Sequence, residues 1–572
     1  MDSGTHAKSA AKRQTASEAP RTDIGTFIIH WAAAIAMIAS LITGFRIAAD
    51  DRNLAFARWL EPILPGGEIW TVHFIAGLAL FFAMTAYVVY LARTGLARRN
   101  MLRRLNALLM PAAGKLRWAA VNVLLHWALY LLVAVMTATG IGLYVGFGGW
   151  VVTVHYLASI AAFAYIFVHT LTHFVYGGWR QLLRIFWPAR LESSPAVRPR
   201  PVFYAVAAGI VMAAFAASFD FGTRDELHVA KVGAAPTLDG VLNDDVWKNA
   251  KPVFVRTQQG SNLAGTGEST VEMKAVQNGN RLYFAFRWDD PTRSLRRLPL
   301  QKRKDGWHLL NDYADIADVA TFYEDKFAIL FSQSNDFGGG GTTYMGEKPI
   351  AGKPAAMHKR GLHYTTDGSY ADMWQWKASR GGHLGQVDDH YFGPPREPTA
   401  AEAAGTARYQ GGYWNDPGKA FYSYNYKSEP PGGYKGPVKL NRLPKDLAVT
   451  TAALKTFDLD PESMDAEGAQ WWMTEAESVP YSADLDAAIP VGTVIPGVLI
   501  IGKYEGDRAD VTGAAKWEDG HWTLEATRVL ATGSTYDQDF VRGRDLYAWV
   551  SVFDHNQTRH TRHVRPVKIV LD

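Results

Sequence analysis

The distribution of apolar residues divides the chain into two unlike halves. Residues 1–219 contain several long apolar runs, whereas residues 220–572 are rich in Gly, Asp, Tyr and Trp and alternate apolar with polar residues over short stretches. About 20 consecutive apolar residues suffice for a helix to cross a bilayer. The first half therefore predicts five membrane-spanning helices, at residues 25–47, 69–92, 119–145, 151–176 and 202–219.

The fourth apolar segment, VVTVHYLASIAAFAYIFVHTLTHFVY, carries three histidines. Two of them, His155 and His169, are separated by 14 positions, which on a helix is roughly 21 Å of rise and nearly four whole turns. They therefore project from one face at two membrane depths. Ionisable groups at such positions are costly and usually functional. Imidazoles at two depths are what two hemes would need from one helix, although hydrogen bonding to other helices is an alternative.

The membrane half contains a weak internal repeat. FIIHW and LITGF in the first span are echoed by VLLHW and TATGIGLY in the third, and WTVHF in the second by VVTVHY in the fourth. Each half is thus expected to be a helical hairpin with histidines near both membrane surfaces. His30, His126 and His169 are expected toward one surface, and His73 and His155 toward the other, so that the depths match in pairs.

These features resemble the diheme cytochrome b family, which includes the membrane subunits of formate dehydrogenases and nickel–iron hydrogenases and the bacterial b-561 cytochromes. The motifs are HW in the first span, a histidine opening the second and two histidines in the fourth, and they cover residues 22–188. The resemblance implies that two b-type hemes are bound without covalent attachment. Their ligands would be His30 with His169 on the inner side and His73 with His155 on the outer side.

Two further histidines leave alternatives open. The depth of His126 also suits the inner heme, and its other interpretation is a polar contact to a heme propionate or the quinone region. His173 lies one turn beyond His169 and could substitute for it. Small residues in these helices would allow close approach of a porphyrin or a neighbouring helix, although ordinary helix packing explains them equally well. They are Gly44, Gly77, Gly140 and Gly142.

Charged residues predict the orientation in the membrane. Arginine and lysine cluster after the second and fourth spans, whereas the loop after the first span mixes acidic with basic residues and the turn GFGGW has no charge. Positive charge favours the cytoplasmic side. Residues 1–22 are therefore expected to be a disordered cytoplasmic tail and residues 189–201 a basic cytoplasmic linker, with residues 220–572 periplasmic and the protein in the inner membrane.

The composition excludes several classes of site. The chain contains no cysteine, so disulfides, iron–sulfur clusters, thiolate zinc sites and covalent c-type heme are ruled out. The net charge of +4 is small, and its basic residues gather in membrane loops. This distribution indicates that the basic residues set the orientation of the helices in the membrane and do not bind a nucleic acid.

Residues 220–572 predict an all-β domain. Segments such as RLYFAFRWDD, KFAILFSQ, HWTLEATRVL and DLYAWVSVFD alternate apolar and polar residues between turn-forming residues, which is typical of the strands of a β-sandwich. Two inserts rich in Gly, Pro and aromatic residues, at about 335–370 and 380–440, are expected to form functional loops. No catalytic triad, phosphate-binding loop or zinc motif is recognisable in this half.

Several stretches of this half resemble the heme-binding gamma subunit of ethylbenzene dehydrogenase and its relatives. They include APTLDGVLNDDVWKNA, YADMWQWKASR, PGVLIIGKYEGDRADV and RDLYAWVSVFD, and the resemblance as a whole covers about residues 228–572. The resemblance implies one more heme b, whose iron is bound by a methionine and a lysine. The lysine corresponds to Lys377, and Trp374 and Trp376 would form an apolar wall for the porphyrin.

The methionine of that pair is less sharply determined by the sequence. Met273, in STVEMKAV, is the first choice, and Met345 and Met357 are alternatives. His358 and His363 are close enough in sequence to Lys377 to be rival ligands.

The two halves together predict an all-α membrane four-helix heme bundle at residues 23–188, a fifth transmembrane helix at 202–219 and an exported all-β sandwich heme-binding domain at 220–572. Three b-type hemes would pass electrons between a periplasmic redox partner and the membrane quinone pool, as an electron-transfer subunit with quinone oxidoreductase activity. The alternatives are a membrane-anchored binding or sensor module, and a reductase of a small extracellular acceptor such as ferric iron.

Overall fold

The fold consists of two compact units, one helical and one rich in β-structure. The helical unit comprises Met1–Ala48, Val72–Gly140 and Val154–Gly222, and the β-rich unit comprises Ala49–Thr71, Ile141–Thr153 and Thr223–Asp572. The structure is a computed structural model, and it describes residues 23–51, 54–110, 114–186, 199–311, 313–315, 318–319, 321–345, 361–404, 407, 409–427, 436–455 and 458–572.

The predicted membrane spans are confirmed as helices. Among the described residues, five helices are long and apolar enough to cross a membrane. A short helix, α2 (Ala55–Leu60), follows the first of them. The long helices are α1 (Ile24–Ala48), α3 (Ile69–Thr94), α4 (Gly114–Tyr144), α5 (Trp150–Leu182) and α6 (Pro199–Gly222).

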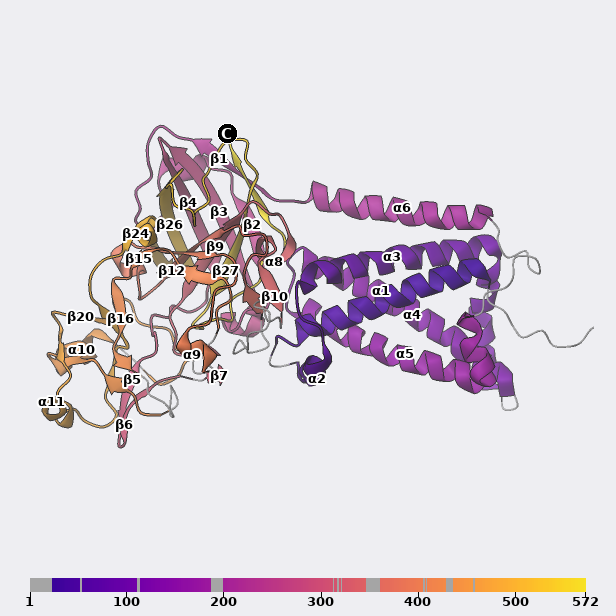
Figure 1. The fold of residues 1–572 in the computed structure, drawn as a ribbon, viewed down its shortest axis with the longest axis horizontal. Helices are drawn as coiled ribbons and strands as arrows, with labels where there is room; N and C mark the ends of the chain where they lie inside the picture. The colour runs from indigo at the N-terminus through magenta and orange to yellow at the C-terminus, as the bar shows by residue number, and fades with distance from the viewer. Residues whose placement is uncertain are drawn as a thin grey trace, which may run out of the picture. The chain divides into compact units, whose positions relative to one another are not determined.

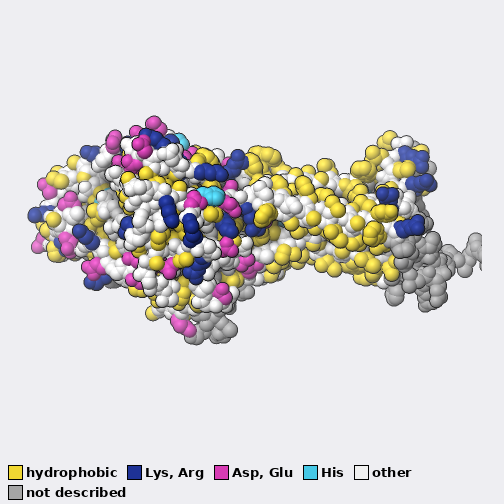
Figure 2. Space-filling model, turned by 90° about the horizontal axis from the view of Figure 1, so that it is seen from above, with side chains coloured by type: hydrophobic (Ala, Val, Ile, Leu, Met, Phe, Trp, Pro, Cys, Tyr) yellow, Lys and Arg dark blue, Asp and Glu magenta, His cyan; other side chains and the backbone are white. Residues whose placement is uncertain are grey.

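The flank of the helical unit is apolar to a degree that suits lipid and not water. Large apolar side chains are exposed on successive helices, among them Ile35, Leu131 and Phe203. Figure 2 shows hydrophobic side chains covering this flank and Lys and Arg side chains gathered at one end of the unit. Exposed apolar area of this extent marks a membrane or protein contact, which agrees with the membrane helices predicted from the sequence.

Glycines explain where the fourth span ends. The predicted span stops at residue 176, and the backbone of α5 leaves the helical conformation directly afterwards, at Gly177 and Gly178. Gly178 has φ of 62°, which residues with a Cβ rarely adopt. The apolar run therefore ends where the helix breaks, and only a short helical continuation follows.

The fifth long helix packs against α3, as Figure 1 shows. Ala86 and Tyr90 of α3 form a small buried cluster with Ala205 of α6. Gly209 allows close approach at the next contact, because a Cβ there would overlap the ring of Phe82. Small residues at such crossings are the usual means of joining helices in membranes.

A twelve-stranded curled sheet forms the β-rich unit. The first half of its order consists of β14 (Tyr413–Asn415), β13 (Asp388–Phe392), β12 (Ala371–Lys377), β9 (Lys326–Ser332), β27 (Leu546–Phe553) and β28 (Val567–Leu571). The order continues with β1 (Glu226–Lys231), β3 (Ser269–Asn278), β4 (Arg281–Asp289), β26 (His521–Val529) and β25 (Thr512–Glu518), and β2 (Val253–Thr257) pairs with β3. Strand β1 joins the two halves, because it pairs in parallel with β28 on one side and with β3 on the other.

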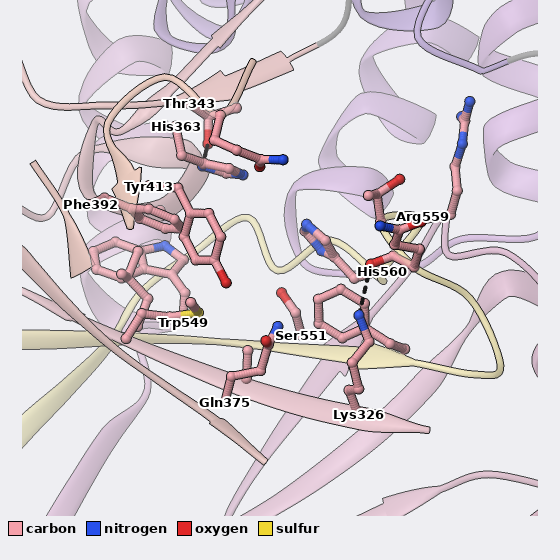
Figure 3. A pocket seen from close by; sticks show the side chains of 18 of the residues that line it. Lys326, Thr343, His363, Gln375, Phe392, Tyr413, Trp549, Ser551, Arg559 and His560 are labelled. Atoms are coloured by element: carbon pink, nitrogen blue, oxygen red, sulfur yellow. Dashed lines mark hydrogen bonds between the residues drawn. The ribbon is translucent and has the colours of Figure 1, made fainter. Parts of the chain in front are cut away.

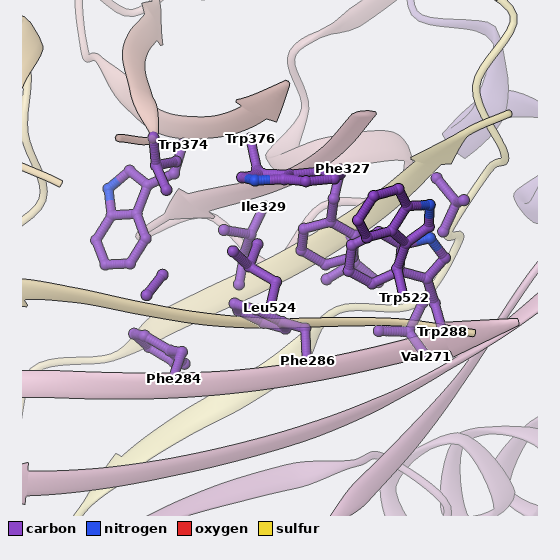
Figure 4. Packing of buried hydrophobic residues seen from close by; sticks show 14 of the residues in the cluster. Val271, Phe284, Phe286, Trp288, Phe327, Ile329, Trp374, Trp376, Trp522 and Leu524 are labelled. Atoms are coloured by element: carbon purple, nitrogen blue, oxygen red, sulfur yellow. The ribbon is translucent and has the colours of Figure 1, made fainter. Parts of the chain in front are cut away.

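The main core lies between the two halves of this sheet, as expected of a sandwich. Figure 4 shows Phe284 and Phe286 of β4 facing Trp374 and Trp376 of β12 across this space. Every residue of β9 and β12 is buried. A strand covered on both faces has no polar side, so the outer face of β9 and β12 must also be covered.

Shorter elements surround the sheet. Strands β5 (Leu300–Arg303), β6 (Gly306–Leu309) and β22 (Val494–Ile495) form a small sheet over a second apolar cluster. The hairpin of β10 (Thr343–Met345) and β11 (Gly361–His363) belongs to the first of the predicted inserts. The short helices are α7 (Asp245–Asn249), α8 (Phe337–Gly340), α9 (Ala400–Ala403), α10 (Leu447–Ala453) and α11 (Ala483–Ala487).

Candidate functional site

The structure brings together the two histidines predicted for the outer side of the membrane. His73 lies on α3 and His155 on α5, and their ring centroids are 6.4 Å apart with an interplanar angle of 83°. The Nδ1 atom of His73 lies 3.0 Å from Thr43 Oγ1, and the Nδ1 atom of His155 lies 2.8 Å from Thr139 Oγ1. Each ring is therefore oriented by a threonine of the preceding long helix.

The threonine hydroxyls assign the protonation of both rings. Thr43 Oγ1 donates to the carbonyl of Ala39 at 2.7 Å, and Thr139 Oγ1 donates to that of Val135 at 2.6 Å. Because a hydroxyl has a single proton, each threonine oxygen must accept from the histidine. We therefore assign the ring proton to Nδ1, which gives Nε2 the lone pair that binds a metal.

These contacts follow the internal repeat of the sequence. A Thr-Gly dipeptide comes at the same distance after the first histidine of each half, as Thr43-Gly44 and Thr139-Gly140. A Cβ at Gly44 would lie 3.0 Å from Cε1 of His73, and one at Gly140 would lie 3.5 Å from Cε1 of His155. Glycine thus lets each imidazole stand close to the neighbouring helix, as expected for these two residues.

A second group of histidines lies elsewhere in the helical unit. The ring centroids of His126 on α4 and His169 on α5 are 5.9 Å apart, and His173 lies 4.7 Å from His169. His30 of α1 is near enough to interact electrostatically with both His126 and His169.

Hydrogen bonding differs among the members of this second group. Nδ1 of His126 meets the carbonyl of Asn122 at 2.7 Å, and Nδ1 of His169 lies 3.3 Å from the hydroxyl of Tyr165. Nδ1 of His30 is buried and has no hydrogen-bond partner among the described residues. A buried polar atom in that state marks a place where a further group fits.

The outer face of β9 and β12 borders a cavity of about 480 Å³ in the β-rich unit. Its lining includes Leu330 of β9, Gln375 of β12 and Ser551 of β27. Residues of the predicted inserts enclose it, among them Phe392 and Tyr413, as Figure 3 shows. This cavity explains why β9 and β12 are buried on both faces.

The structure does not bring Met273 and Lys377 together. Met273 belongs to the core between the sheet halves, with Trp374 and Trp376. Lys377 is on the other face of β12 and lines the cavity. The two tryptophans therefore pack the core and do not border the cavity that Lys377 faces. Of the alternative ligands, Met345 and His363 line the cavity, whereas Met357 and His358 lie outside the described residues.

Lys377 is held in a buried charge network. Its Nζ forms an ion pair with Asp388 and lies 3.1 Å from Nε2 of His390. Arg508 donates two further hydrogen bonds to Asp388, at 2.6 and 2.8 Å. Burial lowers the pKa of Lys377 to about 8, against the opposing effect of the Asp388 carboxylate.

Two histidines stand on opposite sides of the cavity (Figure 3). The ring centroids of His363, at the end of β11, and His560, in the loop after β27, are 6.4 Å apart with an interplanar angle of 33°. Burial lowers the pKa of His560 to about 4, so its ring is neutral at pH 7. His363 was expected from the sequence as a rival ligand, whereas His560 was not, because nothing in the sequence near His560 distinguishes it from a histidine of an ordinary loop.

The comparisons with known proteins agree with both resemblances read from the sequence. A family model described as prokaryotic cytochrome b561 matches residues 21–188, and one described as ethylbenzene dehydrogenase matches residues 244–565. The first match covers the six histidines of the long helices α1, α3, α4 and α5, which are His30, His73, His126, His155, His169 and His173. It supports a transmembrane electron-transfer cytochrome b and implies heme b in the membrane domain.

No curated protein matches the chain significantly. Among solved structures, a family 9 carbohydrate-binding module from Caldicellulosiruptor kristjanssonii in complex with glucose is 8% identical, covers 60% of this chain and 95% of its own, and has a TM-score of 0.21. A putative carbohydrate-binding protein from Bacteroides uniformis is 7% identical, covers 61% and 100%, and has a TM-score of 0.24. These scores are too low to indicate a shared fold.

The two family matches therefore coincide with the two patterns of the sequence, one with the long apolar runs and the other with the short alternating segments. The ethylbenzene dehydrogenase match covers more than half of the chain and lies within the β-rich unit. The chain belongs to the ethylbenzene dehydrogenase family and carries, in the same polypeptide, an N-terminal region that matches the prokaryotic cytochrome b561 family.

Proposed function

We propose that this protein passes electrons between a periplasmic redox partner and the membrane quinone pool through three b-type hemes. Two hemes would be bound in the helical unit and one in the β-rich unit. The observation that carries the proposal is the pair of imidazoles of His73 and His155, which are 6.4 Å apart and both oriented through Nδ1.

The ring separation of this pair suits two ligands on opposite sides of one metal ion. A ligating imidazole nitrogen is about 2 Å from the ion and about 1.1 Å from its own ring centre, so trans imidazoles have centres about 6.2 Å apart and tetrahedral ones about 5 Å. The observed 6.4 Å agrees with the trans arrangement. Two imidazoles so placed could hold a b-type heme between them.

The inner heme would take His169 as one ligand and His30 of α1 as the other. The buried, unpartnered Nδ1 of His30 supports a group bound beside it. His126 is the rival, because its ring is 5.9 Å from that of His169. His155 and His169 are 14 positions apart on α5, which is roughly 21 Å of helix rise, so the two heme sites would lie at two membrane depths.

The chain's own residues would hold and separate the redox centres. The histidines would bind the iron, the helices would exclude water from it, and α5 would fix the spacing of the two membrane sites. When bound, heme supplies the one-electron chemistry. The protein would thus act as an electron-transfer subunit, and quinone oxidoreductase activity is expected near the inner heme.

The orientation of the chain follows from its basic residues. Arg93 lies in the last turn of α3, Arg180 and Arg184 follow the apolar part of α5, and Arg200 lies in the first turn of α6. The topology that puts these ends in the cytoplasm places the N-terminus there too. The β-rich unit would then be periplasmic, where it meets a soluble electron-transfer protein or oxidoreductase.

Heme stoichiometry tests this proposal directly. We expect purified full-length protein to contain three hemes per chain in a pyridine hemochrome assay, all of them extractable with acidified acetone because none is covalent. In a stopped-flow experiment, quinol should reduce some of this heme within the mixing time. Two hemes per chain would restrict electron transfer to the helical unit, and none would contradict the proposal entirely.

A reporter fused after Asp572 tests the orientation separately. Alkaline phosphatase, which folds only outside the cytoplasm, should be active in this fusion, whereas a fusion within residues 95–113 should be inactive. The reverse pattern would contradict the proposed topology and leave the heme sites untouched.

A further inference from the structure

We propose that His363 and His560 bind the iron of the heme in the β-rich unit, one from each face. This inference rests on the third heme of the proposed function. It departs from the methionine and lysine pair that the family resemblance implies. The departure has a structural reason. Met273 lies on the side of β12 opposite the cavity, and the Nζ of Lys377, which lines the cavity with Met345, is held in an ion pair with Asp388.

The separation of the two rings matches that of the pair in the helical unit. The centroids of His363 and His560 are 6.4 Å apart, as are those of His73 and His155. A tetrahedral site such as that of zinc would bring two rings to about 5 Å. The cavity thus holds its two imidazoles at the spacing of trans ligands, and its volume of about 480 Å³ is of the size that holds a cofactor.

The ring of His363 is oriented in the same way as the outer membrane histidines. Its Nδ1 lies 3.4 Å from Thr343 Oγ1, and this hydroxyl donates its proton to the carbonyl of Gly338. The threonine oxygen must therefore accept from Nδ1 of His363. The ring also stacks on Phe392, with centroids 4.5 Å apart and planes 9° from parallel.

His560 is fixed with the same tautomer by the backbone. Its Nδ1 lies 2.8 Å from the carbonyl oxygen of Thr561, which has no proton to give. Nδ1 must be the donor, so Nε2 is the basic nitrogen. The ring packs against Phe553 at 4.9 Å, which limits its rotation.

A third histidine of the cavity serves as an internal comparison. His563 also lines the cavity, but its Nδ1 accepts a hydrogen bond from the backbone N–H of Val550 at 3.1 Å. Its proton is therefore on Nε2, and that nitrogen has no lone pair for iron. The hydrogen bonds thus select His363 and His560 from the three histidines that line the cavity.

The remaining lining suits the other parts of a heme. Apolar contact is offered by Leu330, Met373 and Trp549. Basic side chains suit the two propionates, and they outnumber the carboxylates even when Asp388 and Glu324, which pair with Lys377 and Arg380, are included. The basic residues of the lining are Arg297, Lys326, Lys377, Arg380, Arg559 and Arg562.

The first test compares alanine variants of the full-length, heme-loaded protein. His363→Ala and His560→Ala should each lower the heme content from three to two per chain, or leave one heme high-spin by electron paramagnetic resonance. Added imidazole should restore the low-spin signal. His521→Ala, which removes a histidine of β26 that pairs with Asp289 outside the cavity, should retain three low-spin hemes.

The second test separates ligation from a loss of folding. His560→Met keeps a ligand at this position, and a near-infrared charge-transfer band of methionine-bound ferric heme should appear in magnetic circular dichroism. This band should be absent from the unchanged protein. If the unchanged protein showed this band, and if the band disappeared in Met345→Leu or Met373→Leu, the assignment to two histidines would be overturned.

The outcomes distinguish the inference from the proposed function. Three hemes in the unchanged protein, with unaltered spectra in both His363→Ala and His560→Ala, would overturn the ligand assignment and leave the third heme intact. If the heme spectrum changed only in Lys377→Met, lysine ligation would be indicated and the assignment to His363 and His560 would also be overturned. Two hemes in the unchanged protein would overturn both the third heme and its ligands.

Discussion

The helical unit and the β-rich unit hold histidine pairs at the same ring separation by different means. His73 and His155 come from two long helices, and each ring is oriented by a threonine of another helix. His363 ends a three-residue strand, and His560 lies in a loop between β27 and β28. The shared spacing of 6.4 Å therefore does not depend on one kind of scaffold.

The difference lies in how the surroundings orient the rings. In the helical unit, regular helices and a repeated Thr-Gly dipeptide determine where the imidazoles point. In the β-rich unit, aromatic rings and single hydrogen bonds perform this role, and one of the bonds is 3.4 Å long. We therefore expect the outer membrane site to be the more rigid of the two, and the following variants test this comparison.

The largest effect is expected from removing a ligand of the outer membrane heme. His155→Ala should lower the heme content of the full-length protein from three to two per chain and stop electron transfer from quinol to the β-rich unit. The reason is that His155 is the only partner of His73 in the proposed pair. Hemochrome assay and stopped-flow reduction measure the two effects.

The control for this variant is His228→Ala, on the half-exposed surface of β1, which should change neither quantity. If His155→Ala kept three hemes with unaltered spectra, the outer pair would be refuted. The pair of His73 and His155 could then no longer serve as the standard for the ring separation in the β-rich unit.

The next largest effect is expected from removing the second ligand of the inner heme. His30→Ala should remove this heme and abolish quinol oxidation, whereas His126→Ala should keep three hemes and change the potential of one of them. His126 would retain a polar role because it lies near His169 without binding iron. Redox titration with heme counting separates the two cases, and the opposite result would assign the ligand to α4.

The sequence was informative where periodicity converts spacing into geometry. On a helix, 14 positions mean two points on one face, so the depths of His155 and His169 could be predicted without any structure. Close approach at Gly44 and Gly140 was also expected from the sequence, with ordinary helix packing as an equally good alternative. Thr43 and Thr139 precede these glycines directly and were overlooked, although the repetition of the dipeptide was visible in the sequence.

The β-rich unit was predictable in its fold and not in its site. Alternation of apolar and polar residues indicated the strands, and the order of motifs indicated the family. Which face of β12 borders a cavity depends on what covers it, and a strand buried on both sides has no pattern that distinguishes them. Met273 and Lys377 were therefore paired by resemblance, and the contact of His363 with His560 joins segments that no local pattern relates.

Removing the threonine contacts should weaken the outer membrane site without destroying it. Thr43→Val and Thr139→Val keep the side-chain shape and remove the hydroxyl that contacts Nδ1 of the facing histidine. Loss of such a contact typically lowers metal affinity by about 10–100-fold. Faster transfer of heme to apomyoglobin should report this loss at unchanged initial stoichiometry. Thr170→Val is the matched control, because Thr170 bonds the carbonyl of Ile166 on the same helix as His155 but orients no histidine.

The corresponding change in the β-rich unit should have the smallest effect. Thr343→Val removes an Nδ1 contact of 3.4 Å, which is near the limit of a hydrogen bond. The stacked ring of Phe392 still holds His363 in place, so heme loss should accelerate only a few-fold, less than in Thr43→Val. Thr365→Val provides the control, since Thr365 bonds the carbonyl of Ser369 and no histidine. Equal acceleration in Thr343→Val and Thr43→Val would mean that hydrogen bonds, and not the surrounding scaffold, determine how firmly each site holds its ligand.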